Sequence, residues 1–549
     1  KKTNRHRDEV FVEYSENEEA AVRTERWKLV YTTGKRERRD GYTTGRPLPG
    51  RTIRLFDLEH DPDEMTSVAD RPENAPVVAG LTQKLADHLR RTARRPEQIS
   101  QSGDVYTQID QLLKPRDVRA KPNIVFILAD DLGYGDVGCY GQKLVQTPHI
   151  DALAAAGMRF TQCYAGSTVC APSRCVLMTA RHTGHCTVRG NALVPLRPED
   201  VTVAEVLQSA GYATGLVGKW GLGEPETSGL PNRQGFDEFF GFLNQHHAHN
   251  YYPDYLWRNE QKLPLGNVVP RDNIASMRRE YAPDLFTAEA LSFIDRHAEQ
   301  PFFLYLACTL PHANNERGRA EGNGMEVPDD APYSDRAWPQ AQKNHAAMIT
   351  RLDAGVGQVL AKLKEAGLEE ETIVFFSSDN GPHKEGGADP LFFKSAGPLR
   401  GHKRDLTDGG IRVPFIVRWP GKIAAGSQSD QVAWFADFLP TAAELGGARP
   451  QAGLDGVSLV GTLLGKAKTF ERTLYWEFHE GGFRQAVRMG DWKGIRLKPE
   501  TPLALYDIAR DPSESQDVAA EHPEVVAKIE GYLKTARTES EDFPVKGAK

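Results

Sequence analysis

The chain has 549 residues, a formal net charge of −7 at pH 7 and 39% hydrophobic residues. Such a length accommodates about two to four structural units with a sizeable core. The mild negative charge argues against a general nucleic-acid or membrane-surface binder, and no apolar run is long enough to span a membrane.

The N-terminus gives no information on localisation, because Lys1 is followed by no charged-then-apolar leader. We expect the sequence to be a processed chain or a fragment. Its six cysteines show no paired metal spacing and are too few for a disulfide-rich scaffold. Apart from Cys170, we expect them to be small buried hydrophobes, and one disulfide is left open.

An internal repeat links the two ends of the chain. Residues 21–28 (Ala-Val-Arg, then Trp-Lys) recur at the same spacing in residues 486–493, and residues 55–62 (Leu-Phe-Asp-Leu, then Asp-Pro) recur as residues 505–512. A helical pattern follows each copy, from Val78 to Arg91 and from Val525 to Thr535. Each end is therefore predicted to form one strand-turn-strand-helix unit, with the polar residues 101–120 as a linker after the first.

Short apolar runs alternate with helical patterns between the two copies. The runs are predicted strands at 123–128, 213–217, 302–306, 372–376 and 413–417, and the helices are predicted at 149–156, 202–209, 287–297 and 344–366. This alternation predicts an α/β fold with a large, mainly parallel sheet covered by helices on both faces. In such sheets the ligand lies beyond the carboxyl ends of the strands.

Polar residues follow the predicted strands at this edge: Asp130 and Asp131, Lys219, His312, and Asp379 with Asn380. An Asp-Asp pair by itself is commonly a helix cap or a turn. Four oxygen-bearing side chains from two strands, however, are the ligands that a hard divalent cation prefers. The sequence therefore predicts a metal site at the strand ends.

The stretch Cys170-Ala171-Pro172-Ser173-Arg174 has an ordinary structural interpretation, a turn that opens a helix with its proline in the first turn. It also has the pattern C-x-P-S-R. Together with Pro122-Asn123-Ile124, Gly218-Lys219-Trp220, Pro311-His312, Asp379-Asn380-Gly381 and residues 399–403, it resembles the sulfatase family of the alkaline phosphatase superfamily. The resemblance implies a large mixed-sheet α/β domain followed by a smaller antiparallel sheet with a packed helix.

The resemblance also implies how the site would be built. Asp130, Asp131, Asp379 and Asn380 would hold the metal together with residue 170, with calcium as the expected ion and magnesium as the alternative. Cys170 would be converted to formylglycine by a formylglycine-generating enzyme during maturation, and Asp379 would act as the base.

Positive groups are expected around the transferred sulfuryl group. Arg174, Lys219, Lys403 and the metal would provide these charges, and Arg174 would also hold the aldehyde hydrate. Either Lys403 or His312 would protonate the leaving oxygen. Outside their motifs, Lys219 and Lys403 would be ordinary surface lysines and His312 a structural histidine.

One position departs from the family pattern. Many sulfatases have a histidine two residues after the lysine of Gly-Lys-Trp, where this chain has Gly221. The substrate-contacting candidates are therefore sought elsewhere, in His246, His247, His249 and Trp257. The alternatives are a polar loop without a ligand and a core tryptophan.

The resemblance predicts a sulfatase that hydrolyses sulfate esters of a carbohydrate or an aryl alcohol and is periplasmic or secreted. A phosphomonoester or phosphodiester hydrolase of the same superfamily and an inactive carbohydrate-binding homologue are the alternatives. The expected domains are a catalytic domain at 121–465 and a C-terminal subdomain at 466–549. Residues 1–100 are expected to resemble the C-terminal subdomain of a preceding sulfatase module, or to dock on the catalytic domain.

Overall fold

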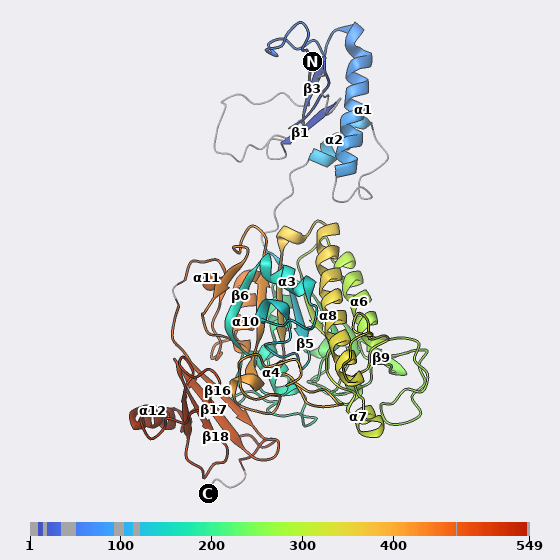
Figure 1. The fold of residues 1–549 in the computed structure, drawn as a ribbon. Coiled ribbons are helices and arrows are strands. Elements are labelled where there is room, and N and C mark those ends of the chain that lie inside the picture. Colours follow the sequence, from blue (N-terminus) through green and yellow to red (C-terminus); the bar gives the residue numbers. More distant parts are fainter. Residues whose placement is uncertain are drawn as a thin grey trace. The chain divides into compact units, whose positions relative to one another are not determined.

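The structure, a computed structural model, describes residues 9–14, 19–33, 51–92, 104–113, 121–467 and 469–545. The chain forms two compact units, residues 1–118 and residues 119–549 (Figure 1). Each unit has its own hydrophobic core.

The first unit is a four-stranded antiparallel sheet covered by a helix. Its strands, in spatial order, are β1 (Val10–Tyr14), β2 (Glu19–Arg23), β3 (Trp27–Thr32) and β4 (Thr52–Asp57), and the covering helix is α1 (Ala75–Thr92). Alternate residues of the strands, such as Val22 and Leu29, pack against Leu85 of the helix. The amphipathic pattern of each element thus closes one small core.

A helix in the predicted linker, 101–120, corrects that prediction in part. Val105–Leu113 form the helix α2, and Tyr31 Oη donates a hydrogen bond of 2.7 Å to Asp110 Oδ1 on it. The apolar residues Val105 and Ile109 pack in the core of the first unit. Their spacing of four residues was the helical signal that the polar composition of the segment concealed.

The second unit is built on a large mixed sheet of eleven strands among the described residues. Its spatial order is β10-β9-β8-β7-β11-β5-β12-β13-β6-β14, with β15 also paired to β6. The strands are β5 (Asn123–Ala129), β6 (Met158–Tyr164), β7 (Ala213–Lys219), β8 (Glu238–Phe242), β9 (Tyr255–Arg258), β10 (Gln261–Pro264), β11 (Phe302–Ala307), β12 (Thr372–Ser378), β13 (Arg412–Arg418), β14 (Ser427–Ser429) and β15 (Ala433–Trp434). The central strands from β8 to β12 are parallel, and β13 is antiparallel to both of its neighbours.

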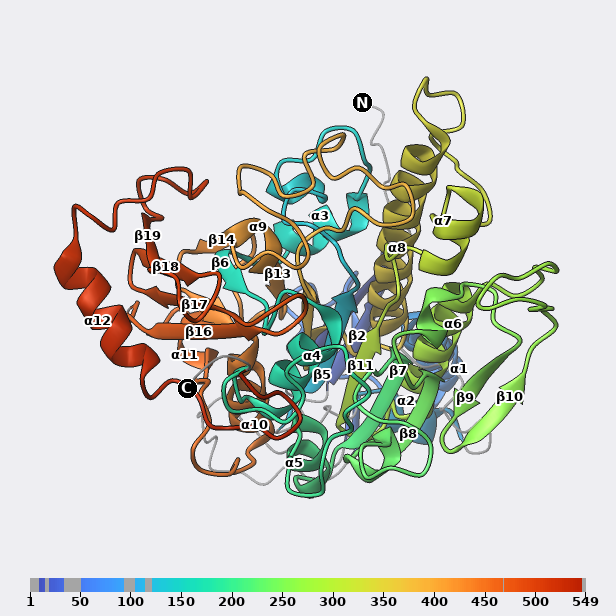
Figure 2. The same ribbon diagram turned by 90° about the horizontal axis from the view of Figure 1, so that it is seen from below.

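Helices cover both faces of this sheet (Figure 2). One face carries α3 (Pro148–Ala155), α6 (Ala282–Arg296) and α8 (Gln340–Glu365), and the other carries α4 (Cys170–Thr179), α5 (Val203–Ser209), α10 (Phe438–Gly446) and α11 (Val460–Leu463). Residues of β5 alternate between the two cores: Phe126 packs on the side of α10, and Ile127 packs on the side of α6 and α8. The predicted fold class is confirmed.

The predicted helices are present with shifted bounds. The clearest shift is in α6, which begins five residues before the predicted start at Thr287 because Pro283 occupies its first turn, where no backbone N–H is needed. Helix α5 begins after Thr202, whose side chain forms a capping box with Glu205.

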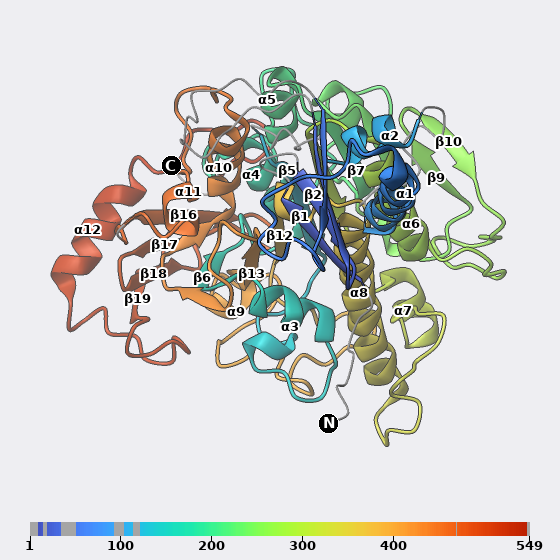
Figure 3. The same cartoon turned by 90° about the horizontal axis from the view of Figure 1, so that it is seen from above.

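A second antiparallel sheet forms the C-terminal part of this unit, and its outer face carries α12 (Pro523–Leu533) (Figure 3). The strands are β16 (Thr473–Phe478), β17 (Arg484–Met489), β18 (Trp492–Arg496) and β19 (Ala504–Asp507). Tyr475 faces α12, whereas Leu474 and Trp476 pack into the core beside the large sheet. The sheet is therefore buried on both faces.

No helix among the described residues is long and apolar enough to cross a membrane. All six cysteines are described, and all are free thiols. The disulfide that the sequence left open is absent from the described structure.

Candidate active site

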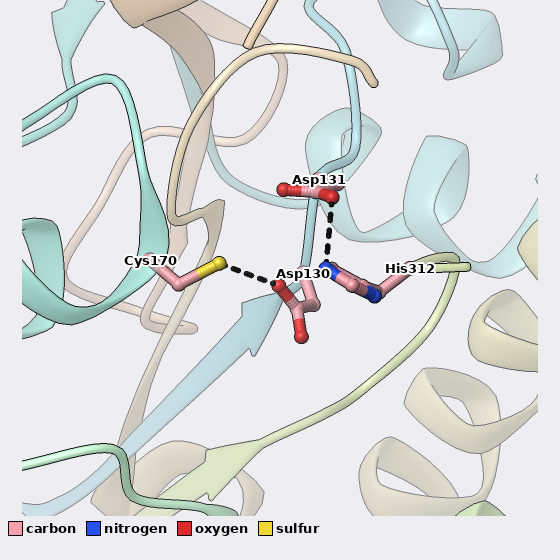
Figure 4. A group of neighbouring side chains, drawn as sticks. All are labelled: Asp130, Asp131, Cys170 and His312. Atoms are coloured by element: carbon pink, nitrogen blue, oxygen red, sulfur yellow. Dashed lines mark hydrogen bonds and ion pairs between the residues drawn. The ribbon is translucent and has the colours of Figure 1, made fainter. Parts of the chain in front are cut away.

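Cys170 is the first residue of α4, and every residue of this helix is buried. Val169 before it is extended, and Pro172 fits the first turn because a backbone N–H there has no partner within the helix. The Sγ atom lies 3.4 Å from Asp130 Oδ1 (Figure 4). Burial raises the pKa of the Cys170 thiol well above its usual range, so the side chain is a neutral thiol in this environment.

The predicted strand-end residues lie together because β5 and β12 are parallel neighbours with Ala129 opposite Ser378. Asp131 N–H donates to Asp379 Oδ1 at 3.0 Å, and Asn380 Nδ2 donates to Asp131 Oδ1 at 2.7 Å. Asp131 has a positive φ of 65°, which is unusual for a residue other than glycine. This backbone turn directs its carboxylate toward Asn380.

Three buried cations pair with these carboxylates. Lys219 Nζ lies 2.7 Å from Asp130 Oδ2, and Lys403 Nζ lies 2.8 Å from Asp131 Oδ2. Arg174 Nη2 donates to Asp379 Oδ2 at 2.8 Å.

Burial and neighbouring charges shift the pKa values of these carboxyl groups. Although burial opposes it, the charge of Lys403 holds the pKa of Asp131 well below its usual range. Burial and the charge of Asp130 raise the pKa of Asp379 to about 7. One carboxyl of the group can therefore exchange a proton near neutral pH.

His312 completes this group from the loop after β11. Its Nδ1 lies 2.7 Å from the carbonyl oxygen of Ala313 and so carries the proton, which leaves Nε2 to accept from Lys403 Nζ at 3.1 Å. Burial and the charge of Lys403 hold the pKa of His312 well below its usual range. Figure 4 shows Nε2 directed at Asp131, 3.5 Å from Oδ2.

The residues present fit a divalent metal ion. Donor atoms of Asp130, Asp131, Cys170 and His312 all lie within 4.8 Å of one another. Asn380 Oδ1 is buried and has no hydrogen-bond partner among the described residues, which is costly for an amide oxygen unless a ligand uses it. Carboxylate and amide oxygens in this number suit calcium or magnesium.

The three loop histidines have different surroundings. The His249 ring stacks on His312 with centroids 5.0 Å apart, and its Nδ1 lies 2.9 Å from Glu316 Oε2. His246 is exposed and lies 3.2 Å from Asp272 Oδ1. His247 packs between Phe242 and Tyr255, and burial lowers its pKa to about 4.

Of these histidines, only His249 contacts a member of the group around Cys170 within the described structure. Trp257 lies on β9, half-buried against the core, and Lys262 Nζ lies 5.5 Å from its ring centre. None of its described contacts is with that group.

Sequence reasoning missed Glu385, whose carboxylate lies 3.3 Å from Lys403 Nζ. It also missed Asn191, whose Oδ1 accepts the N–H of Ala171 at 3.0 Å. The third missed residue is Gln245, which lies against Gly221. Gly221 has a φ of 82°, and a Cβ atom on it would lie 2.0 Å from Gln245 Nε2. The only available signal was proximity: Glu385 follows Asp379-Asn380 closely, and Gln245 immediately precedes the histidine pair.

Three family models match parts of this chain. The family model described as Sulfatase matches residues 122–448, the one described as N-sulphoglucosamine sulphohydrolase, C-terminal matches residues 401–539, and the one described as C-terminal region of aryl-sulfatase matches residues 5–115.

Individual relatives cover about three quarters of this chain. Arylsulfatase A of Homo sapiens is 34% identical over 473 residues, which cover 75% of this chain and 87% of the human protein. N-acetylgalactosamine-6-O-sulfatase of Bacteroides thetaiotaomicron is 32% identical over 494 residues, 76% of this chain and 93% of that protein. The crystal structure of Ps i-CgsB in complex with k-i-k-neocarrahexaose is similar with a TM-score of 0.65 and 28% identity, over 76% of this chain and 92% of that one.

Proposed function

Because the chain belongs to the sulfatase family and is a sulfate ester hydrolase, we propose that it acts on a sulfated carbohydrate through a formylglycine made from Cys170 and a divalent metal ion. The observation that carries the proposal is the position of Cys170. Its Sγ lies against Asp130 at the N-terminus of a buried helix, with Lys219 and Arg174 around the same carboxylate.

Asp130, Asp131, Asp379 and Asn380 would hold the metal together with residue 170, with calcium as the expected ion and magnesium as the alternative. A bound divalent ion would supply positive charge to the sulfate oxygens. The unpaired Oδ1 of Asn380 supports this assignment.

The cysteine in the structure stands in for a hydrated aldehyde, which would supply two hydroxyl groups. One would attack sulfur and displace the alcohol of the ester, whose S–O bond breaks. Loss of the proton from the other hydroxyl group would then break the C–O bond to the bound sulfate, release sulfate and restore the aldehyde. Asp379, whose Oδ2 accepts hydrogen bonds from Arg174, would take the first proton as the base.

The cations have separate tasks in this proposal. Arg174 orients Asp379, and Lys219 faces the charge that develops on the sulfuryl oxygens. Lys403 is the better proton donor to the leaving oxygen. It holds its proton, whereas the unprotonated Nε2 of His312 accepts from it.

Two relatives support a carbohydrate substrate. One is named an N-acetylgalactosamine-6-O-sulfatase, and another was crystallised with a neocarrahexaose. Sulfate release should therefore be measured on a panel of sulfated sugars, with 4-nitrophenyl sulfate and 4-nitrophenyl phosphate as reference substrates. Faster release of phosphate than of sulfate would favour the phosphoester hydrolase.

Mass spectrometry of the Cys170 peptide tests the mechanism directly. Active protein is expected to carry formylglycine at this position, made by a formylglycine-generating enzyme in the producing cell. Active protein with only unmodified cysteine would contradict the mechanism. A thiol in protein that binds sugars but releases no sulfate would support the inactive homologue instead.

We also propose that residues 1–100 are the tail of a preceding sulfatase module and that the chain is periplasmic or secreted. The family match at residues 5–115 supports the first point. The ion pair between Lys28 and Glu64 in the first unit also has its counterpart in Lys493 and Glu514 of the C-terminal sheet. Deletion of residues 1–118 tests the first point, because lost activity or a lower melting temperature would favour a docked role. Cell fractionation tests the localisation.

A further inference from the structure

Lys403, the proposed proton donor to the leaving oxygen, has three hydrogen-bond acceptors around its ammonium group. Asp131 Oδ2 lies 2.8 Å from Nζ, His312 Nε2 lies 3.1 Å from it, and Glu385 Oε2 lies 3.3 Å from it. An ammonium group has three N–H donors, so each acceptor can take one. Because the lysine side chain is a flexible stem of four carbons, the position of its nitrogen depends on the groups that hold it.

Glu385 is the one of these three acceptors that lies outside the group around Cys170. It stands in the loop after β12, where its N–H donates to His383 Nδ1 at 3.1 Å. The Glu385 side chain is 20% exposed, whereas that of His312 is 3% exposed. Glu385 therefore supports Lys403 from the side of the protein surface.

A second cation shares the Glu385 carboxylate. Arg404 Nη1 donates to Oε1 at 2.5 Å, while Lys403 Nζ donates to Oε2. The two cations are consecutive in the sequence, and Arg404 has a positive φ of 77°, which is uncommon for a residue other than glycine. Both side chains nevertheless reach one carboxylate, so Glu385 is fixed between them.

The C-terminal sheet fixes Arg404 in turn. Arg404 Nε donates to Glu480 Oε2 at 3.0 Å, in the loop between β16 and β17. Arg484 of β17 donates from Nη1 to the carbonyl oxygen of Arg404 at 3.1 Å and from Nη2 to that of Glu480 at 2.9 Å. A continuous series of ion pairs therefore connects this loop, through Arg404 and Glu385, to Lys403.

The charges in this series are balanced within the protein. Arg404 pairs with Glu385 and Glu480, and Lys403 pairs with Asp131 and Glu385. Each cation thus lies between two carboxylates, which leaves no surplus positive charge to attract a second anionic group of the substrate. The arrangement suits the support of Lys403 better than it suits the binding of another sulfate.

The position of Lys403 matters at the moment when the ester bond breaks. The leaving alcohol would keep the electrons of the S–O bond and take one proton from Nζ, and the amine would later regain a proton from water. The two remaining N–H groups would hold the nitrogen during this transfer. Loss of one acceptor lets the donor shift, and a displacement of about 1 Å can cost about a hundredfold in rate.

We propose that Glu385 is a positioning residue for the proton donor Lys403, and that Arg404 and Glu480 hold Glu385 in place, so that the C-terminal sheet supports cleavage of the S–O bond. The inference rests on the proposed function, in which Lys403 protonates the leaving oxygen. It concerns alcohols that leave poorly without a proton, such as those of sugars.

The test compares leaving groups that need a proton with one that does not. Glu385→Gln replaces the carboxylate with a neutral amide of the same size. For the sulfated monosaccharide that the wild type hydrolyses fastest in the panel, kcat is expected to fall about 10- to 100-fold at an unchanged KM. For 4-nitrophenyl sulfate, whose phenolate leaves without a proton, kcat should fall less than about threefold. Phenyl sulfate, with a poorer leaving group than 4-nitrophenolate, should lie between the two.

The matched control is Glu260→Gln. It removes the carboxylate from an exposed ion pair with Arg233, also at 3.3 Å, and should change neither rate. Glu480→Gln acts at the far end of the series, outside the group around Cys170. It should lower kcat on the sugar by about two- to fivefold, as for a partly exposed pair, and leave 4-nitrophenyl sulfate unaffected.

A double-mutant cycle identifies the residue through which Glu385 acts. Lys403→Met is expected to lose more activity on the sugar than on 4-nitrophenyl sulfate. Adding Glu385→Gln to Lys403→Met should lower kcat on the sugar by less than about a further twofold, because the residue that Glu385 positions is already gone. The melting temperature of each variant, in the full chain with calcium present, shows whether it is folded.

Three results would overturn the inference. Equal losses of Glu385→Gln on all three esters would place Glu385 at the sulfuryl group or the metal, and an unchanged kcat on the poorer leaving groups would show that Lys403 needs no such support. A double variant whose loss equals the product of the two single losses would show that Glu385 acts independently of Lys403. A wild-type enzyme that releases sulfate from none of the esters would contradict the proposed function itself, and the inference would fail with it.

Discussion

Arg174 donates two hydrogen bonds to the same carboxylate oxygen of Asp379, from Nε at 3.1 Å and from Nη2 at 2.8 Å. Both side chains are completely buried. Arg174 Nη1 also donates to the carbonyl oxygen of Lys219 at 2.6 Å. The guanidinium therefore links α4, which carries Cys170, to the ends of β7 and β12.

Replacement of this arginine is expected to reduce both stability and activity. In Arg174→Met, Asp379 keeps its burial and loses its cation, and such a loss is destabilising by about 3–5 kcal/mol. Arg174→Lys keeps a charge but not the forked geometry, so the free energy of unfolding of this variant should lie between those of the wild type and of Arg174→Met. Urea denaturation with EDTA present measures the effect. The exposed pair of Arg233 and Glu260 gives the control Arg233→Met, for which less than about 1 kcal/mol is expected.

Calcium is expected to stabilise the protein and EDTA to abolish sulfate release. With calcium at about one hundred times its Kd, the gain is about 2.7 kcal/mol. Asn380→Leu removes the unpaired oxygen while keeping the volume of the side chain, so the calcium-dependent rise in melting temperature should shrink. If calcium and magnesium leave the wild-type melting temperature unchanged, the metal assignment is wrong.

The pH dependence of stability should reveal Asp136, which lies outside the group around Cys170. Burial raises its pKa to about 7, while its Oδ2 accepts the N–H of Gly133 at 2.8 Å. A folded pKa above the unfolded value of about 3.9 gives stability that is complete below about pH 4 and is lost as the pH rises through 7.

Asp136→Asn keeps an acceptor for Gly133 and never becomes charged. The free energy of unfolding of this variant should exceed that of the wild type at pH 8 by on the order of 2–4 kcal/mol, and the difference should vanish near pH 4. Equilibrium denaturation at several pH values measures both. A difference that does not depend on pH would show that Asp136 is not titrating.

Much of the fold follows from patterns that are local in the sequence. The apolar run that became β5 is buried throughout, and its position before Asp130 located the edge at which the site lies. The antiparallel direction of β13 could not be predicted, because a buried run has the same composition in either direction.

The candidate site was predictable only where its residues stand in motifs. His312 lies five residues beyond the end of β11, so spacing from the strand alone would not have brought it to Lys403. Gln245 has no motif at all. Its relation to Gly221 arises because the segments after β7 and β8 pair through backbone hydrogen bonds, which sequence spacing does not reveal.

The repeated ion pair provides a matched experiment on the C-terminal sheet. Lys493 Nζ lies 2.6 Å from Asp408 Oδ1 and 3.0 Å from Glu514 Oε1, and all three side chains are fully buried. Lys28, its counterpart in the first unit, pairs with Glu64 at 2.5 Å, and each of these side chains is 27% exposed.

Lys493→Met would leave the buried Glu514 without its cation and Asp408 with only the longer pair to Arg412 at 3.4 Å, so we expect a loss of about 3–5 kcal/mol in the free energy of unfolding of the second unit. Lys28→Met should cost the first unit less than about 1 kcal/mol, because water can solvate Glu64 when its partner is removed. Scanning calorimetry of both variants in the full chain makes the comparison. Among the described residues, only the C-terminal copy pairs its lysine with Asp408. Equal losses in the two variants would mean that Asp408 adds nothing to the stabilisation by Lys493. A large loss of stability in Lys493→Met alone would show that this lysine stabilises the packing of the C-terminal sheet on the catalytic domain through its ion pair with Asp408.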